Sequence, residues 1–491
     1  MDELFFPGNS GKNSVWPGEL INSLNLYTVS RHWFSLKELR IMNDDTKESE
    51  TLPVFNTVLL CATLVFLVYF NSLGGEFVFD DRTYVIANYL IKNFDLQNLR
   101  EIFTSFYGWD YLPLTLLSLN VDYMIWGLNP FGYHLTNLLL HLLNGLILHR
   151  LVYHLVRSRS AALWVALLFL VHPVHVESVA WISERKNVLS MFFLLLAFYR
   201  YRISGPGLGS VFLFLSACLA KSSAVTFPLL LVLNDFCFSR KPRTRIVSDS
   251  TPYFLIALVV SAVTLMANIQ GGTIREHQEG NIFFTAISMI VVFKEYLAKF
   301  LVPVNLNVWY PNPLVASLSA GQLVFSFLMC GFFLAALAAS WKNHKIVFFG
   351  LSWFAVTLLP VSHIVPIPQM MADRFLYLPS IGGILAFVSF LRTFWKPRFL
   401  IRRLFLIGIV SGFVILDMNR VPVFHQDLVL WQDSVRKDAN NTIAMMYLGL
   451  AYWEKGEWDK ALEKLALARE IDPNNFKAGR KKQEDRPQAR P

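Results

Sequence analysis

Residues 53–84 read PVFNTVLLCATLVFLVYFNSLGGEFVFDDRTY, an apolar run followed by two adjacent acids and an arginine. The apolar part, up to Phe70, would form roughly 27 Å of helix, which is enough to cross a bilayer. A Gly-Gly pair ends that helix, so Asp80, Asp81 and Arg82 follow just beyond the membrane. Ionisable side chains at this boundary indicate chemistry or ion binding, and the simpler alternative is a solvated turn.

The composition predicts a polytopic membrane protein. Apolar residues make up 54% of the 491 and charged residues only 16%, whereas about 25% of an average soluble chain is charged. The formal charge of +9 is carried by short basic clusters between apolar runs, a positive-inside pattern that argues against nucleic-acid binding. The four cysteines lie in or beside apolar runs without paired spacing, so neither a disulfide framework nor a zinc site is predicted.

Further apolar runs predict additional membrane helices. Residues 72–133, after the first run, are predicted to be a long outer loop that contains an amphipathic surface helix at 95–106 and a second helix at 115–126. The later runs lie at 134–153, 161–171 (extending towards Trp181), 188–199, 210–219, 224–238, 253–267, 323–340, 347–362, 375–394 and 404–416.

The basic clusters between these runs set the predicted orientation. A cytoplasmic N-terminus places the first three basic clusters, at 157–159, 200–202 and 240–245, in the cytoplasm. If the apolar segment 281–302 crosses, Lys342 and Lys345 lie outside; if it lies on or re-enters the outer face, every cluster is inside. Charged side chains within this segment favour the alternative in which it does not cross the membrane. We therefore predict about 11 spans, with the acidic loop (residues 77–84) and the C-terminus both outside.

The chain is expected to divide into four parts. Residues 1–52 form a cytoplasmic N-terminal segment without a secretory signal, in which Met42 is an alternative start. Residues 53–417 form the membrane domain, and residues 418–476 form tetratricopeptide-like helices. Residues 477–491 form a disordered basic tail.

The tetratricopeptide prediction rests on residues 442–475, which match the 34-residue repeat pattern, and residues 424–440 could supply a preceding half-repeat. One repeat cannot bury a stable core by itself, so the repeat should pack on the preceding helix or on the membrane domain. The matching positions are Leu448, Gly449, Tyr452, Ala461, Ala468 and Pro473.

Asp80 and Asp81 are the predicted catalytic pair. A carboxylate at this position could take the proton from an attacking hydroxyl group. Its partner could orient that group, or the two acids could hold a divalent cation through oxygen ligands. Arg82, beside them, is predicted to be either a substrate contact or a structural residue.

A second polar cluster, HPVHVESVAWISERKN at 172–187, lies at the outer end of the third apolar run. His172, His175 and Glu177 are metal-ligand types, but the proline between the histidines excludes a helical i,i+4 metal site. Structural hydrogen bonding or substrate contact is therefore favoured for these residues and for Glu184.

Several cations are predicted to lie on the outer side, where the positive-inside rule disfavours them. Arg185 and Lys186 lie near the end of the second cluster, Lys221 lies between two short runs, and Arg374 opens a membrane helix beside Asp373. An arginine at such a boundary can hold a phosphate bidentately, and an Asp373–Arg374 ion pair is the alternative. We predict that Arg185, Lys221 and Arg374 contact a lipid-linked phosphate.

Five stretches resemble the tetratricopeptide-containing GT-C glycosyltransferases, a family of bacterial membrane proteins and the eukaryotic transmembrane O-mannosyltransferases that modify cadherins. The resemblance covers roughly residues 52–475. It implies a GT-C membrane fold, a polyprenyl- or dolichyl-phosphate-linked sugar donor, inversion at the anomeric carbon and catalysis by the acidic pair, here Asp80 and Asp81. The stretches read FVFDDRTYVIAN, LTNLLLHLLNGLIL, FLVHPVHVESVAWISERKNVLSMFF, LAKSSAVTFPLLLVLNDF and MADRFLYLPSIG.

The chain departs from this family in two features. Relatives often have Arg-Pro-Leu or His-Pro-Leu after the first loop, whereas this chain has Tyr111-Leu-Pro-Leu114 and lacks that basic contact. Many relatives also have long repeat arrays. This chain has about one and a half repeats, which weakens the case for a protein acceptor recruited by the repeats.

The leading hypothesis is a multi-pass membrane glycosyltransferase that acts on the outer face. The expected partners are a polyprenyl-phosphate-linked sugar, a protein or glycan acceptor, the bilayer and a protein bound through the repeat segment. No cofactor is required, although a divalent cation is an option. The resemblance implies the bacterial inner membrane, or the endoplasmic reticulum in a eukaryote. The alternatives are a transporter or flippase for lipid-linked sugars and a non-catalytic repeat scaffold.

Overall fold

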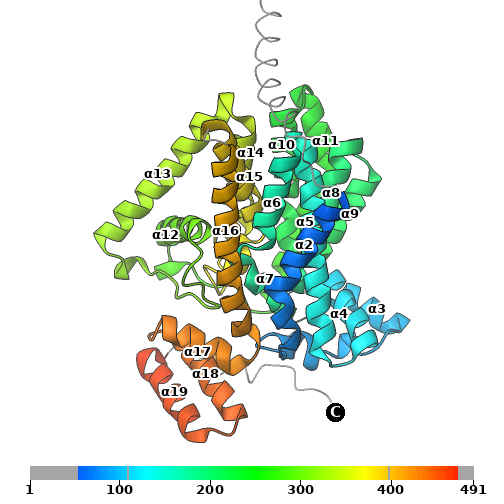
Figure 1. The fold of residues 1–491 in the computed structure, drawn as a ribbon. Helices are drawn as coiled ribbons and strands as arrows, with labels where there is room; N and C mark the ends of the chain where they lie inside the picture. The colour runs from blue at the N-terminus through cyan, green and yellow to red at the C-terminus, as the bar shows by residue number, and fades with distance from the viewer. Residues whose placement is uncertain (1–53, 108–109, 396–398, 474–491) are drawn as a thin grey trace, which may run out of the picture. The chain divides into compact units, whose positions relative to one another are not determined.

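The computed structural model describes residues 54–107, 110–395 and 399–473. Within these ranges the chain is helical, and the only β-type pairing is an isolated bridge between Tyr107 and Asp110 (Figure 1). The predicted α-helical class is therefore confirmed. The expected N-terminal segment (1–52), with Met42, and the expected tail (477–491) lie outside the described residues.

The first apolar run forms α2 (Val54–Tyr69), which continues into the short helix η2 (Phe70–Gly74) as predicted. After the acidic loop, η3 (Arg82–Ile86) and η4 (Tyr89–Ile91) precede two longer helices. These are α3 (Leu96–Thr104), capped by the Asp95 side chain, and α4 (Pro113–Trp126). Both helices predicted for this loop are present.

The later apolar runs also form helices, and the chain breaks where proline or polar residues interrupt them. Pro173 follows α6, and the helices on either side of this break are bent by 52°. The bounds are α5 (Pro130–Val156), α6 (Arg159–Leu170), η5 (Pro173–His175), α7 (Val176–Ala180), η6 (Ile182–Glu184), α8 (Arg185–Ser204), α9 (Leu208–Ala220), η7 (Ser222–Thr226), α10 (Phe227–Phe238), α11 (Arg243–Gln270), α12 (Ile282–Leu301), α13 (Ala320–Asn343), α14 (Lys345–Thr357), η11 (Asp373–Leu376), α15 (Pro379–Phe394) and α16 (Phe399–Arg420).

Fewer helices than predicted are long and apolar enough to cross a membrane. Four described helices meet that description, and the bent pair Arg159–Leu170 and Pro173–Ala180 would make a fifth. Shorter apolar helices account for several of the other predicted spans, so the number 11 stays a prediction. The helix α12 is not among the four, and it carries Lys294, Glu295 and Lys299. The four helices are Val54–Gly74, Pro130–Val156, Arg243–Gln270 and Ala320–Asn343.

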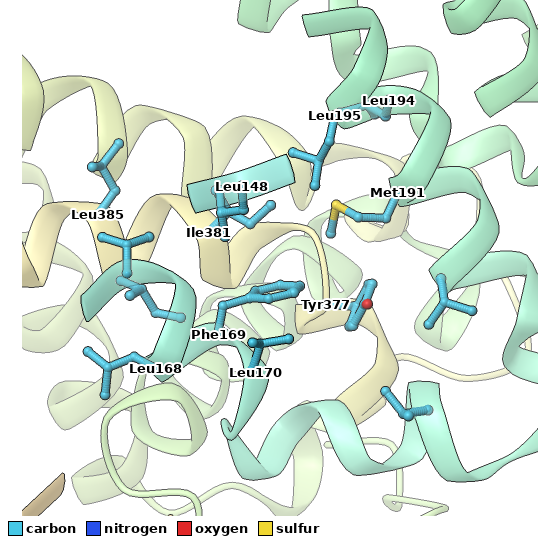
Figure 2. Close-up of a cluster of buried hydrophobic side chains, with 14 of the residues drawn as sticks. Leu148, Leu168, Phe169, Leu170, Met191, Leu194, Leu195, Tyr377, Ile381 and Leu385 are labelled. Atoms are coloured by element: carbon cyan, nitrogen blue, oxygen red, sulfur yellow. The ribbon is translucent and has the colours of Figure 1, made fainter. Parts of the chain in front are cut away.

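A large apolar core joins α5, α6, α8 and α15. Figure 2 shows the rings of Phe169 and Tyr377 among leucine, isoleucine and methionine side chains of these helices, and both rings are buried. The helices α14 and α15 approach closely at Gly350 and Gly382, where a Cβ on Gly382 would lie 2.3 Å from the Gly350 carbonyl oxygen. This packing fixes α15, and with it the preceding turn η11, against the rest of the bundle.

The C-terminal helical segment comprises α17 (Asp427–Lys437), α18 (Thr442–Glu454) and α19 (Trp458–Ile471). The last two helices lie where the repeat pattern predicts them, and a Cβ on Gly449 would lie within 3.2 Å of the Ala461 carbonyl oxygen. Arg420 of α16 pairs with Asp433 of α17 at 2.6 Å. The segment thus packs on the preceding helix (Figure 1), as its small size requires.

Candidate functional site

The acidic loop is fixed by Asp81. This side chain is fully buried, and its two oxygens accept hydrogen bonds from the backbone N–H of Val78 (3.0 Å) and of Ser183 (2.7 Å). The Ser183 hydroxyl donates a third bond. Burial raises the pKa of Asp81 to about 7 although these hydrogen bonds oppose the shift. Asp81 therefore ties the loop to η6, which contains Ser183.

Asp80 has a different environment. Its residue is half-buried rather than enclosed. Its charge acts on two cations from distant parts of the sequence, because Asp80 contributes to raising the pKa of both Lys186 and Arg374. A carboxylate that is partly accessible and faces fixed cations can serve as a base when a hydroxyl group enters the site.

Three cations converge on the carboxylate of Glu184, and we name Glu184, Lys186, Lys221 and Arg374 the Glu184 cluster. The nitrogen–oxygen distances from Glu184 are 3.5 Å to Lys186, 3.6 Å to Lys221 and 3.4 Å to Arg374. Glu184 is 1% exposed, and each cation is 13–16% exposed. Burial would raise the pKa of Glu184, but the three cations outweigh it and lower that pKa.

Each member of this cluster is supplied by a different structural element. Glu184 ends η6, Lys186 lies in the first turn of α8, Lys221 joins α9 to η7, and Arg374 lies in η11. The close packing of α8 on α9, and of α14 on α15, brings these helix ends together. Glu184 shares these cations with other carboxylates, because Arg374 also pairs with Glu177 and Lys186 lies 4.0 Å from Asp110.

The lysines of the cluster have further contacts. The Lys221 ammonium donates to the Asn187 side-chain oxygen at 2.6 Å. Burial lowers the pKa of Lys221 to about 8, against the opposing effect of Glu184. The Lys186 ammonium lies 5.1 Å from the centre of the Tyr84 ring, and the Tyr84 hydroxyl donates to Asp110 at 2.8 Å. Asp110 is thus a site residue that the sequence interpretation missed, because nothing in its local pattern distinguishes it.

Arg374 also pairs with Glu177. The Arg374 guanidinium bonds to Glu177, whose second oxygen accepts the Arg374 backbone N–H at 3.1 Å. The guanidinium donates to Gln369 at 2.6 Å and lies 5.5 Å from the Trp181 ring centre. Glu177 therefore orients Arg374. The alternative pairing of Arg374 with Asp373 is not what the structure shows, because Asp373 accepts instead from the Tyr310 hydroxyl at 2.7 Å.

Arg185 lies apart from the Glu184 cluster. It is fully buried and pairs with Asp122 at 2.7 Å. Its guanidinium also donates to the Ser118 hydroxyl at 2.8 Å, to the Tyr133 carbonyl at 2.8 Å and to Asn137. These partners occupy its hydrogen-bonding directions. These contacts favour a structural role for Arg185, and its predicted phosphate contact stays a prediction.

The two histidines of the second polar cluster are both hydrogen-bonded within the protein. His172 bonds to the Phe300 carbonyl at 3.0 Å, and His175 bonds to the Phe169 carbonyl (2.7 Å) and to the Ser380 hydroxyl (2.8 Å). Both are buried among aromatic rings, and these contacts favour structural hydrogen bonding over substrate contact, although both roles stay predictions.

Arg82 pairs with the C-terminal helical segment. Its partners are Asp427 at 2.8 Å and Glu454 at 2.5 Å. Among the described residues no group of three His, Cys, Asp or Glu side chains could hold a metal ion. The divalent cation therefore stays a prediction.

Curated relatives of the chain are protein O-mannosyl-transferases by name. Protein O-mannosyl-transferase TMTC3 of Mus musculus is 25% identical over 86% of this chain and 52% of its own length. TMTC4 of Homo sapiens is 27% identical over 69% of this chain and 56% of its own. Tmtc1 of Drosophila melanogaster is 33% identical over 36% of this chain and 22% of its own. The predicted resemblance to this group is confirmed, and the chain spans about half the length of TMTC3 and TMTC4.

No protein-family model matches the chain. Among solved structures, the chain is similar to ArnT from Cupriavidus metallidurans bound to undecaprenyl phosphate. The TM-score is 0.41 at 14% sequence identity, and the match covers 84% of this chain and 75% of ArnT.

Proposed function

We propose that the chain is a membrane glycosyltransferase that moves a sugar from a polyprenyl-phosphate-linked donor to an acceptor hydroxyl group. One observation carries the proposal: the half-buried Asp80 of the acidic loop interacts electrostatically with Lys186 and Arg374, two cations of the buried Glu184 cluster. A phosphate leaving group needs such cations, and an attacking hydroxyl group needs a base next to them. The Glu184 cluster binds the donor phosphate through Lys186, Lys221 and Arg374.

The transfer proceeds as one displacement. The acceptor oxygen attacks the anomeric carbon as Asp80 accepts its proton, and the bond between that carbon and the phosphate oxygen breaks. The bonding electrons leave with the polyprenyl phosphate, whose charge Lys221 and Arg374 stabilise. A single displacement inverts the configuration at the anomeric carbon. Asp81 holds the loop, and Glu184 keeps three mutually repelling cations together.

The substrate class follows from the named relatives. Because these are protein O-mannosyl-transferases, we propose mannose as the sugar and a serine or threonine hydroxyl group of a protein as the acceptor. The proposed orientation places the acidic loop on the outer face, the N-terminus in the cytoplasm and the C-terminus outside. The compartment is the bacterial inner membrane or the endoplasmic reticulum.

One assay separates this proposal from its alternatives. Purified full-length protein in nanodiscs is incubated with polyprenyl-phosphate sugars and an acceptor peptide, and free polyprenyl phosphate and glycosylated peptide are measured. A transferase produces both in equal amounts. A flippase moves the intact donor across proteoliposomes without releasing the phosphate, and a scaffold does neither. Either of the last two outcomes would overturn the proposal.

A further inference from the structure

The C-terminal helical segment contacts the acidic loop directly. The Phe79 backbone N–H donates to Oδ1 of Asp427 at 2.7 Å, and Oδ2 of Asp427 accepts from Arg82 at 2.8 and 3.2 Å. The Glu76 backbone N–H donates to the His425 carbonyl at 2.8 Å. A single carboxylate at the start of α17 thus holds two residues that flank Asp80 and Asp81.

Aromatic contacts extend this junction towards the cations. The Phe79 ring lies between Trp181, Trp431 and Tyr447, at ring-centre distances of 5.5, 5.0 and 4.8 Å. The Trp181 ring also contacts the Arg374 guanidinium, at 5.5 Å. The segment is therefore connected to the Glu184 cluster through two successive rings.

The backbone at Phe79 shows why this junction matters for Asp80. Phe79 has φ +48°, a left-handed conformation that a bulky non-glycine residue adopts only where its surroundings hold it. Asp80 is the next residue, so the direction of its side chain depends on that conformation. The hydrogen bond that the Phe79 N–H donates to Asp427, together with the rings of α17 and α18, holds Phe79 from this side.

We infer that Asp427 is a positioning residue: it holds Phe79 and Arg82 and thereby orients Asp80 for the proton transfer. The inference rests on the proposed function. It gives the C-terminal helical segment a role inside the site, in addition to any role in binding a partner. A segment that served only as a docking module would need no carboxylate on the catalytic loop.

The first readout is kinetic. Full-length Asp427→Ala is compared with wild type for donor turnover, with Asp427→Asn as a milder variant that still accepts from the Phe79 N–H. We expect kcat to fall at least tenfold in Asp427→Ala while the donor KM stays within twofold, because the Glu184 cluster is intact. Glu457→Gln is the matched control, since it breaks an exposed ion pair with Lys460 in the same segment without touching the loop.

The second readout needs no activity. Trypsin cleavage after Arg82 is followed by mass spectrometry on folded protein in nanodiscs, and we expect it to be at least tenfold faster in Asp427→Ala than in wild type and Glu457→Gln. If trypsin cleaves Asp427→Ala after Arg82 at the wild-type rate, or if the kcat of this variant is unchanged, the inference is overturned. If wild type transfers no sugar, the proposed function fails, and the cleavage rates still decide whether the segment holds the loop.

Discussion

At the scale of single residues, Asp80 and Asp81 are neighbours in very different surroundings. Asp81 is enclosed and accepts from Val78 and Ser183, whereas Asp80 is half-buried near Lys186 and Arg374. The sequence indicated both acids as candidate catalytic residues. It could not show that Asp81 holds the loop, because its partner Ser183 lies 102 positions away in the chain. The distinction leads to separate predictions for the two acids.

Asp81→Asn is expected to destabilise the protein. In the variant, the new amide nitrogen would face a backbone N–H that donates to a carboxylate oxygen in wild type. This buried N–H would lose its acceptor, which costs about 1–3 kcal/mol. The measurement is the free energy of unfolding, or the midpoint of thermal unfolding, in nanodiscs. Asp95→Asn is the control, because Asn caps a helix as well as Asp does. Unfolding that is unchanged by Asp81→Asn would contradict the structural role.

Lys221 gives the site a dependence on pH. Its pKa is lowered to about 8, so the ammonium is charged below that pH and loses its proton as the pH rises through it. We expect kcat/KM for the donor to fall about tenfold from pH 7 to pH 9 as the charged fraction declines. Lys221→Arg, which stays charged, should move this fall to higher pH. A wild-type profile that is flat between pH 7 and pH 9 would contradict the assignment.

Arg185 has partners that residue-level sequence reasoning did not foresee. A cation on the disfavoured side was interpreted as an anion contact, but Asp122 and neutral acceptors surround it. Arg185→Met should therefore lower the free energy of unfolding by about 3–5 kcal/mol, because it leaves a buried carboxylate unpaired. Lys221→Met should instead raise the donor KM. A raised donor KM with normal stability in Arg185→Met would restore the original interpretation.

At the scale of helices, apolar periodicity was a reliable guide. Every predicted run contains a helix, although the runs at 347–362 and 375–394 also include turns. The sequence itself indicates the cap at Asp95 and the break at Pro173. The meeting of four helix ends at Glu184 was not predictable, since it depends on which helices pack together. The broken helix after α6 also shortens what the sequence suggested was one span.

The contact between α14 and α15 supports η11 and hence Arg374. In Gly382→Ala the new Cβ would lie 2.3 Å from one backbone oxygen and 2.8 Å from the Phe354 backbone nitrogen, and neither atom can move freely. Overpacking of this kind costs about 1–3 kcal/mol. Gly408→Ala in α16 is the control, because nothing lies within 4 Å of its Cβ. Equal thermal unfolding midpoints for the two variants would contradict this account of the packing.

At the scale of the whole molecule, the C-terminal helical segment closes one side of the acidic loop. The repeat pattern predicted helices at 442–475 and their packing on the preceding helix. It could not predict that Asp427 and Glu454 would pair with Arg82, because these ion pairs join residues 345 and 372 positions apart. The acidic loop with Asp80 and Asp81 is therefore held by contacts between residues near both ends of the described chain.

The most direct test of the central claim is transfer by Asp80→Asn. Wild-type and variant protein in nanodiscs are given saturating polyprenyl-phosphate mannose and an acceptor peptide, and mannosylated peptide is counted over time. The account predicts that kcat falls by about 10²–10⁴-fold, the usual contribution of a general base, while donor KM and thermal stability remain those of wild type. Undiminished transfer by Asp80→Asn would contradict it.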